Sequence, residues 1–133
     1  MLTREPRVAA AWLFGSAARG EMRADSDVDV GIVFQAGVPA TARTALLADL
    51  ASRLEAATTP HPIDVVALEE QGPVFVHSAL RDGKRIAVND EERRVDFESD
   101  ALVHYLDFKP TWDIAAREQP EGMRRWLARY KTS

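Results

Sequence analysis

The sequence predicts an α/β (α+β) fold: a small mixed sheet flanked by helices, followed by a C-terminal helical tail. Short apolar runs typical of strands alternate with longer segments of helical periodicity, which is the pattern of a sheet covered by helices. The chain has 133 residues, 46% of them hydrophobic, which is enough for one buried core. We therefore expect a single domain over residues 1–133, with a core over about 8–88 and a helical tail over about 90–130.

Four segments have the pattern of strands. VAAAWLF (8–14) is apolar in both of its alternating sets, so we expect a strand that is buried on both faces. DVDVGIVF (27–34) alternates, with its valines, Ile32 and Phe34 on one face and Asp27, Asp29 and Gly31 on the other. IDVVAL and KRIAV are the shorter strands, at 63–68 and 84–88.

Five segments have helical patterns. They are 16–23, 39–57 with Leu46, Leu47, Leu50 and Leu54 on its apolar face, 72–83, 90–108 with Val95, Leu102, Tyr105 and Leu106 turned inward, and a last helix to about 130 with a stripe of Met123, Trp126, Leu127 and Tyr130. Pro110 is expected to break the chain between the last two helices, because proline lacks the N–H that a helix interior needs.

Composition excludes several classes of function. The chain has no cysteine, so it has no disulfide and no thiolate metal site. Residues 1–108 carry 11 Lys+Arg against 18 Asp+Glu, whereas residues 109–133 carry 6 against 3. An acidic body disfavours a nucleic-acid substrate, which needs a basic track. No leader or membrane-spanning run is visible, so we expect a cytoplasmic protein without a membrane partner.

Asp27 and Asp29 form the first candidate site. Residues two apart on a strand point the same way, and two carboxylates so placed repel one another. A hard divalent cation compensates for this repulsion: Mg²⁺ takes oxygen ligands and shares its shell with substrate phosphates. Two such ions, about 4 Å apart, can hold the attacking and the leaving oxygen of a displacement.

The turn before this strand supplies a candidate phosphate site. Gly15 lets a ligand approach the backbone, and Ser16 adds a hydroxyl donor at the start of the next predicted helix. Arg19, one turn further on, adds a positive charge for phosphate oxygens.

Asp64 is the candidate third carboxylate, because it lies within an apolar strand where an unpaired aspartate is costly. Taken singly, each of these residues has a plainer interpretation, such as turn chemistry at Asp25-Ser26-Asp27 or a surface cation at Arg19. Their order along the chain indicates a site for nucleotidyl transfer: a strand, then Gly-Ser, then Asp-x-Asp, and then an aspartate within a further strand.

The run GSAARGEMRADSDVDVGIVF (15–34) resembles the signature of the DNA polymerase beta-like nucleotidyltransferase superfamily, and in particular its minimal nucleotidyltransferase (MNT) group. The short chain and the segment RRVDFESDALVHYLDFKP (93–110) resemble the MNT antitoxins that are paired with HEPN toxins. The resemblance covers nearly the whole chain, and the signature shows no departure from the pattern.

The resemblance implies roles by position. Asp27, Asp29 and Asp64 match the catalytic, metal-binding carboxylates, and Gly15, Ser16 and Arg19 match the nucleotide-binding turn. It also implies a Mg²⁺-dependent enzyme that transfers AMP from ATP to a tyrosine hydroxyl of a HEPN RNase toxin. Two alternatives stay open: nucleotide transfer to a small molecule, as in aminoglycoside nucleotidyltransferases, and a module that neutralises its partner by binding alone.

The histidines and tryptophans have plainer interpretations. His61, His77 and His104 are scattered, and no pair has the spacing of metal ligands, so we expect surface or capping roles. Trp12 is expected in the core. The stripe of the last helix favours packing on the chain's own core over a partner surface, although three arginines lie beside it.

Overall fold

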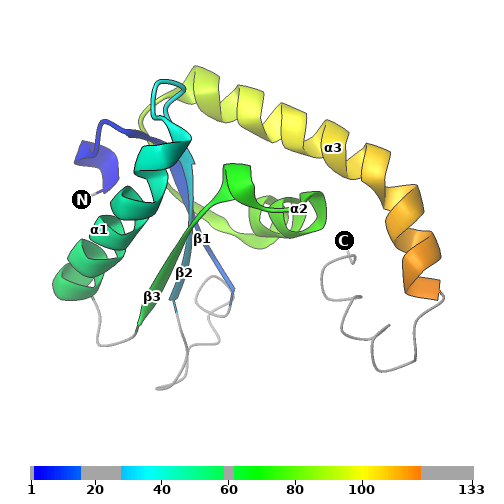
Figure 1. Cartoon of the computed structure of the whole chain (residues 1–133), viewed down its shortest axis with the longest axis horizontal. Coiled ribbons are helices and arrows are strands. Elements are labelled where there is room, and N and C mark those ends of the chain that lie inside the picture. Colours follow the sequence, from blue (N-terminus) through cyan, green and yellow to red (C-terminus); the bar gives the residue numbers. More distant parts are fainter. Residues whose placement is uncertain (1, 16–27, 59–61, 118–133) are drawn as a thin grey trace.

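The computed structural model of the chain describes residues 2–15, 28–58 and 62–117 (Figure 1). Its elements are η1 (Leu2–Arg4), β1 (Val8–Phe14), β2 (Val28–Phe34), α1 (Ala40–Thr58), β3 (Ile63–Ala67), η2 (Leu68–Glu70), α2 (Pro73–Asp82), β4 (Lys84–Val88) and α3 (Glu91–Arg117). The predicted α+β class is confirmed, and all four predicted strands are present within one residue at each end. The helix expected at 16–23 lies outside the described residues. Within the described ranges, no helix combines the length and the apolarity that crossing a membrane requires.

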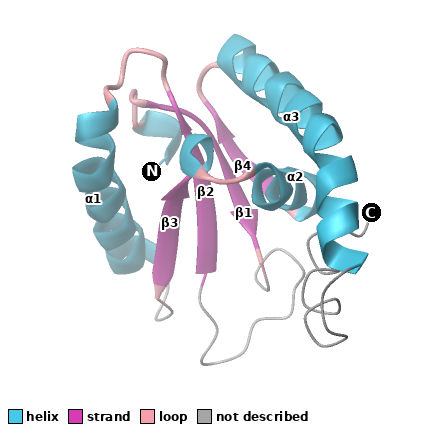
Figure 2. Ribbon diagram, turned by 45° about the vertical axis from the view of Figure 1, so that its right-hand side comes forward, coloured by secondary structure: helices cyan, strands magenta, loops and turns pink. Residues whose placement is uncertain are grey.

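The four strands form one mixed sheet in the order β3-β2-β1-β4. β1 runs antiparallel to both of its neighbours, whereas β2 and β3 are parallel. A parallel pair needs a crossover connection, and α1 supplies it. Figure 2 shows α1 on one face of the sheet and α2 and α3 on the other.

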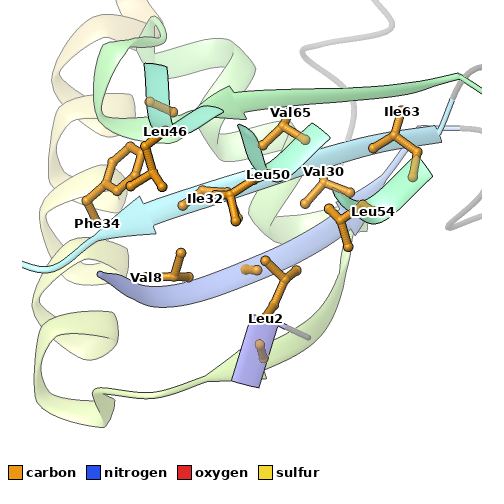
Figure 3. Close-up of a cluster of buried hydrophobic side chains, with 13 residues drawn as sticks. Leu2, Val8, Val30, Ile32, Phe34, Leu46, Leu50, Leu54, Ile63 and Val65 are labelled. Carbon is orange, nitrogen blue, oxygen red and sulfur yellow. The ribbon is translucent and has the colours of Figure 1, made fainter. Parts of the chain in front are cut away.

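The core between the sheet and α1 is built from alternate residues of each strand (Figure 3). Leu46, Leu50 and Leu54 recur at every fourth position of α1 and are all buried. They pack on the β2 face that carries Val30, Ile32 and Phe34. Full burial of a leucine side chain contributes about 2 kcal/mol, so this row holds α1 on the sheet.

The opposite face packs against α2 and α3 around Trp12, which is 2% exposed and confirms the expectation for that residue. All of β1 from Val8 to Trp12 is buried, as its two apolar faces predicted. The His77 ring of α2 stacks on Tyr105 of α3, with centroids 3.6 Å apart. Burial lowers the pKa of His77, and the Arg81 charge lowers it further, so the stacked ring is neutral at pH 7.

Two expectations about the C-terminal half are wrong. Pro110 does not end a helix but lies inside α3, and Figure 1 shows the axis of α3 curving toward its C-terminal end. A proline within a helix removes one hydrogen bond, and a bend accommodates the ring. The separate last helix is therefore not observed up to Arg117. The predicted stripe from Met123 to Tyr130 lies outside the described residues.

The inward face of α3 also differs from the prediction. Tyr105 is buried, but Val95, Leu102 and Leu106 are about half exposed. The face that packs on the sheet and α2 carries Phe97, Ala101 and Tyr105, which are spaced four residues apart. Residues 95, 102 and 106 form a second row on the same helix, so the prediction had combined two different faces.

Glu5 joins the N-terminus to α1 and is a buried charged residue, 6% exposed. Its carboxylate accepts hydrogen bonds from the backbone N–H and the guanidinium of Arg7, at 2.8–3.2 Å, and from Arg53 of α1 at 3.0 Å. The hydrogen bonds from Arg7 and then Arg53 lower the pKa of Glu5 to about 2 against the opposing effect of burial.

We predict that Glu5→Gln lowers the free energy of unfolding by about 2 kcal/mol at pH 7, because charge-assisted hydrogen bonds are replaced by weaker neutral ones. The folded-state pKa lies below the ordinary 4.5, so ionised Glu5 stabilises the fold above pH 4.5. That contribution is lost as the pH falls from 4.5 toward 2. Urea unfolding at pH 7, 5 and 3.5 should show the difference between the two proteins shrinking at the lowest pH. The exposed Glu92→Gln serves as the control, and a difference independent of pH would contradict the assignment.

Candidate active site

Gly15 follows β1 in a backbone conformation that other residues rarely adopt. Its φ is +76°, in the left-handed region that favours glycine. A Cβ at this position would collide with Oδ2 of Asp29 and lie 3.4 Å from its Cγ. The turn therefore needs glycine for two reasons, its φ angle and the close approach of the Asp29 carboxylate.

Asp29 and Asp64 lie side by side on the sheet. They are direct partners in the parallel register of β2 and β3, so both side chains project from the same face. Neighbouring strands are about 4.8 Å apart, which brings two carboxylates to adjacent positions. Asp29 is partly buried and Asp64 is exposed. β3 thus lies directly beside β2, which is the arrangement that a third carboxylate at Asp64 requires.

Two hydrogen bonds at the strand ends fix this register. The Val28 N–H donates to the carbonyl of Pro62 at 2.9 Å. The Ile63 N–H donates to Oε1 of Glu55, on α1, at 2.8 Å. Because a slip by one residue would turn Asp64 to the opposite face, these contacts at the start of β3 decide where its carboxylate points.

The wall beside the carboxylate pair is aromatic. Phe14 is the β1 partner of Asp29, and its ring meets Phe75 of α2 edge to face with centroids 5.5 Å apart. Phe75 could not be assigned from the sequence, since the apolar pattern of α2 gives no indication of which side chain lies near the site. Beyond Asp29 on the same face, Gly31 leaves room for the Leu68 side chain, whose atoms lie about 3 Å from where a Cβ would be.

Of the six predicted site residues, the structure brings together Gly15, Asp29 and Asp64. Ser16, Arg19 and Asp27 lie outside the described residues. Within the described ranges, no group of three or more acidic or histidine side chains is arranged to hold a metal ion. The Asp29–Asp64 pair fits the donor chemistry of Mg²⁺, because it offers adjacent hard oxygens on an accessible face beside a glycine turn.

This fold and this placement of aspartates define a class of protein. A mixed sheet whose parallel pair presents adjacent carboxylates, next to a glycine turn at the end of the neighbouring strand, is the architecture of the nucleotidyltransferase fold. The family model described as "Polymerase beta, Nucleotidyltransferase" matches residues 1–92. The chain belongs to this family.

Several solved structures with a similar fold come from toxin–antitoxin crystal structures. A chain from a toxin–antitoxin crystal structure with AMP-PNP is 22% identical, with a TM-score of 0.67 over 88% of this chain and 91% of that one. A chain from a tri-AMPylated Shewanella oneidensis HEPN toxin in complex with MNT antitoxin is 19% identical, with a TM-score of 0.60 over 86% and 84%. At these identities the likeness shows the fold alone. A comparison with curated proteins gave no match.

We predict that Gly15→Ala lowers the free energy of unfolding by about 2 kcal/mol, through the cost of a left-handed alanine and the collision with Asp29. Gly37→Ala is the matched control, since a Cβ there has nothing within 4 Å, and its effect should stay within about 0.5 kcal/mol. In an Asp29→Ala background the collision is removed, so Gly15→Ala should cost less. Additive effects in this double-mutant cycle, measured by urea unfolding, would show that the two residues are not in contact.

Proposed function

We propose that this chain is an antitoxin enzyme that transfers AMP from ATP to a tyrosine hydroxyl of a HEPN-type RNase toxin and thereby silences it. The observation that carries the proposal is the direct pairing of Asp29 with Asp64, next to the Gly15 turn. Paired carboxylates at this place suit a metal-bound triphosphate. The proposal includes residues 8–88 as the catalytic core of a single domain over 1–133.

Each site residue has a role in this reaction. Asp29 and Asp64, with Asp27, would hold one or two Mg²⁺ ions with the triphosphate. Bound Mg²⁺ would neutralise the phosphate charge and favour the ionised form of the attacking hydroxyl. Gly15 allows phosphate oxygens to approach the backbone, and Ser16 and Arg19 would donate hydrogen bonds to them as pyrophosphate leaves.

The reaction itself is an in-line displacement. The tyrosine oxygen forms a bond to the α-phosphorus, and the bond from that phosphorus to the bridging oxygen of pyrophosphate breaks. Asp64 is exposed, so it is also available to accept the hydroxyl proton. Catalysis of this kind depends mainly on positioning and charge stabilisation, which a rigid sheet edge provides.

The structural relatives support the substrate and the acceptor. One was crystallised with AMP-PNP, an ATP analogue, and another contains a tri-AMPylated HEPN toxin. A third is a toxin–antitoxin variant in which two aspartates separated by one residue are replaced by glutamate. That spacing is also the spacing of Asp27 and Asp29 in this chain.

The test is transfer from ATP labelled at the α-phosphate. We expect the chain with Mg²⁺ to label the protein encoded beside it in the genome, with mass increments of AMP on a tyrosine. Asp29→Asn should reduce this labelling at least about 100-fold while the protein stays folded, since it weakens metal binding without removing volume. Label on a small molecule alone would indicate the aminoglycoside-type alternative. An inhibited but unlabelled partner would indicate neutralisation by binding.

A second prediction concerns the carboxylates without metal. Adjacent like charges destabilise a sheet, so Asp64→Asn should be as stable as the wild type or more stable, by about 0.5 kcal/mol, when Mg²⁺ is absent. It should also gain less stability from added Mg²⁺. Asp96→Asn, at an exposed position of α3, is the control. A marked loss of melting temperature in metal-free Asp64→Asn would mean that Asp64 is a structural hydrogen-bond acceptor instead.

A further inference from the structure

A groove lies between α3 and the segment formed by η2 and the start of α2. Its volume is about 600 Å³, within the range of ligand-binding pockets. The lining is mainly apolar, with Leu68, Val76, Phe97 and Phe108 among its residues. We call it the η2–α3 groove. None of these residues belongs to a motif of the candidate active site.

Besides Gln71 and His104, three carboxylates line the groove. Asp100 and Asp107 line it from α3, two turns apart, and Glu69 lines it from η2. Neither Asp100 nor Asp107 forms an ion pair or a side-chain hydrogen bond with any described residue. Such carboxylates beside apolar surface attract a ligand that carries positive charge.

Glu69 provides a second, independent indication that the groove binds a ligand. Its Oε2 accepts hydrogen bonds from the backbone N–H of Phe34 at 2.9 Å and from Arg93 at 3.5 Å, which fixes the side chain. Its Oε1 is buried and has no hydrogen-bond partner in the described part of the chain. Buried carboxylate oxygens normally accept hydrogen bonds, so a donor brought by a ligand in the groove would satisfy this one.

The groove is close to the candidate active site along the strands. Leu68 is the fourth residue after Asp64, which corresponds to about 13 Å along a strand. The Leu68 side chain also lies over Gly31, two residues beyond Asp29 on the same face. A polypeptide of about four extended residues spans this distance, so one segment can occupy the groove and present a side chain to the aspartates.

We propose that the η2–α3 groove binds a basic segment of the acceptor protein, with apolar side chains on the floor and Lys or Arg side chains at Asp100, Asp107 and Glu69. This inference rests on the proposed function and specifies how its acceptor is recognised. An RNase must hold the phosphates of RNA, so the surface around its active site is basic. An acidic groove is complementary to such a surface, and phosphate-rich RNA is excluded from it.

The experiment measures binding separately from transfer. The probe is the full-length protein encoded beside this chain, and its affinity for the full-length chain is measured by calorimetry at several salt concentrations. Asp100→Lys/Asp107→Lys is the test variant. Glu92→Lys/Asp96→Lys is the matched control, with two exposed carboxylates of the same helix that do not line the groove.

We expect the test variant to bind the partner at least about tenfold more weakly and with a reduced dependence on salt, while the control binds as the wild type does. ATP binding should be unchanged in both variants. Weaker partner binding by the test variant, with normal binding by the control, supports the groove assignment. Absence of AMP transfer by the wild-type chain would overturn only the proposed reaction. Equal binding by both variants overturns the groove assignment and leaves the reaction intact.

Two further outcomes are decisive. If the wild-type chain forms no complex with its genomic neighbour, both the acceptor and the groove assignment fail. The basic segment of this chain, with Arg124, Arg125, Arg129 and Lys131, is the competing occupant. Faster tryptic cleavage at Arg124 and Arg125 in the test variant than in the control, with partner binding unchanged, would assign the groove to that segment and overturn the proposal.

Discussion

The parallel pairing of β2 with β3 is the constraint on which the candidate site depends. It places Asp29 and Asp64 in the same register row, on the same face, at adjacent strands. An antiparallel pairing, or a slip by one residue, would separate the two carboxylates or turn one of them toward α1. The pairing requires α1 as a crossover, and the leucine row of α1 holds that crossover on the sheet. The packing of the apolar core therefore determines where the two carboxylates of the candidate site lie.

Two sets of acidic side chains differ in what they contact. Three glutamates accept backbone N–H groups at or next to strand ends: Glu5 from Arg7, Glu55 from Ile63 and Glu69 from Phe34. They satisfy donors that the sheet leaves unpaired, and so they specify where strands begin and end. Asp64, Asp100 and Asp107, in contrast, form no ion pair within the described ranges. The acidic residues therefore include carboxylates that stabilise the fold and carboxylates that are available to bind a ligand.

Local pattern was sufficient to predict the strands and the positions of Gly15, Asp29 and Asp64, because each depends on period-two alternation or on a turn. The pairing of β2 with β3 came only from the structure, because period-two patterns do not say which strands are neighbours. The long helix was predicted less well. Its apolar residues occupy two rows, and only tertiary packing decides that Phe97, Ala101 and Tyr105 face inward while Val95, Leu102 and Leu106 do not. The prediction for Pro110 was also wrong. A proline is expected to end a helix, but a bend in the helix axis can accommodate its ring.

The η2–α3 groove could not be predicted from the sequence at all, for a related reason. Its walls come from segments that meet only after α2 and α3 have packed together, and the stacking of His77 on Tyr105 is part of that contact. Asp100 and Asp107 look like ordinary solvated residues of a helix when the sequence is considered alone. Only the apolar residues beside them and the buried Oε1 of Glu69 indicate that they line a candidate binding site. Catalytic residues that belong to one motif can thus be recognised in a sequence, whereas a groove formed by separate elements can be recognised only once the fold is known.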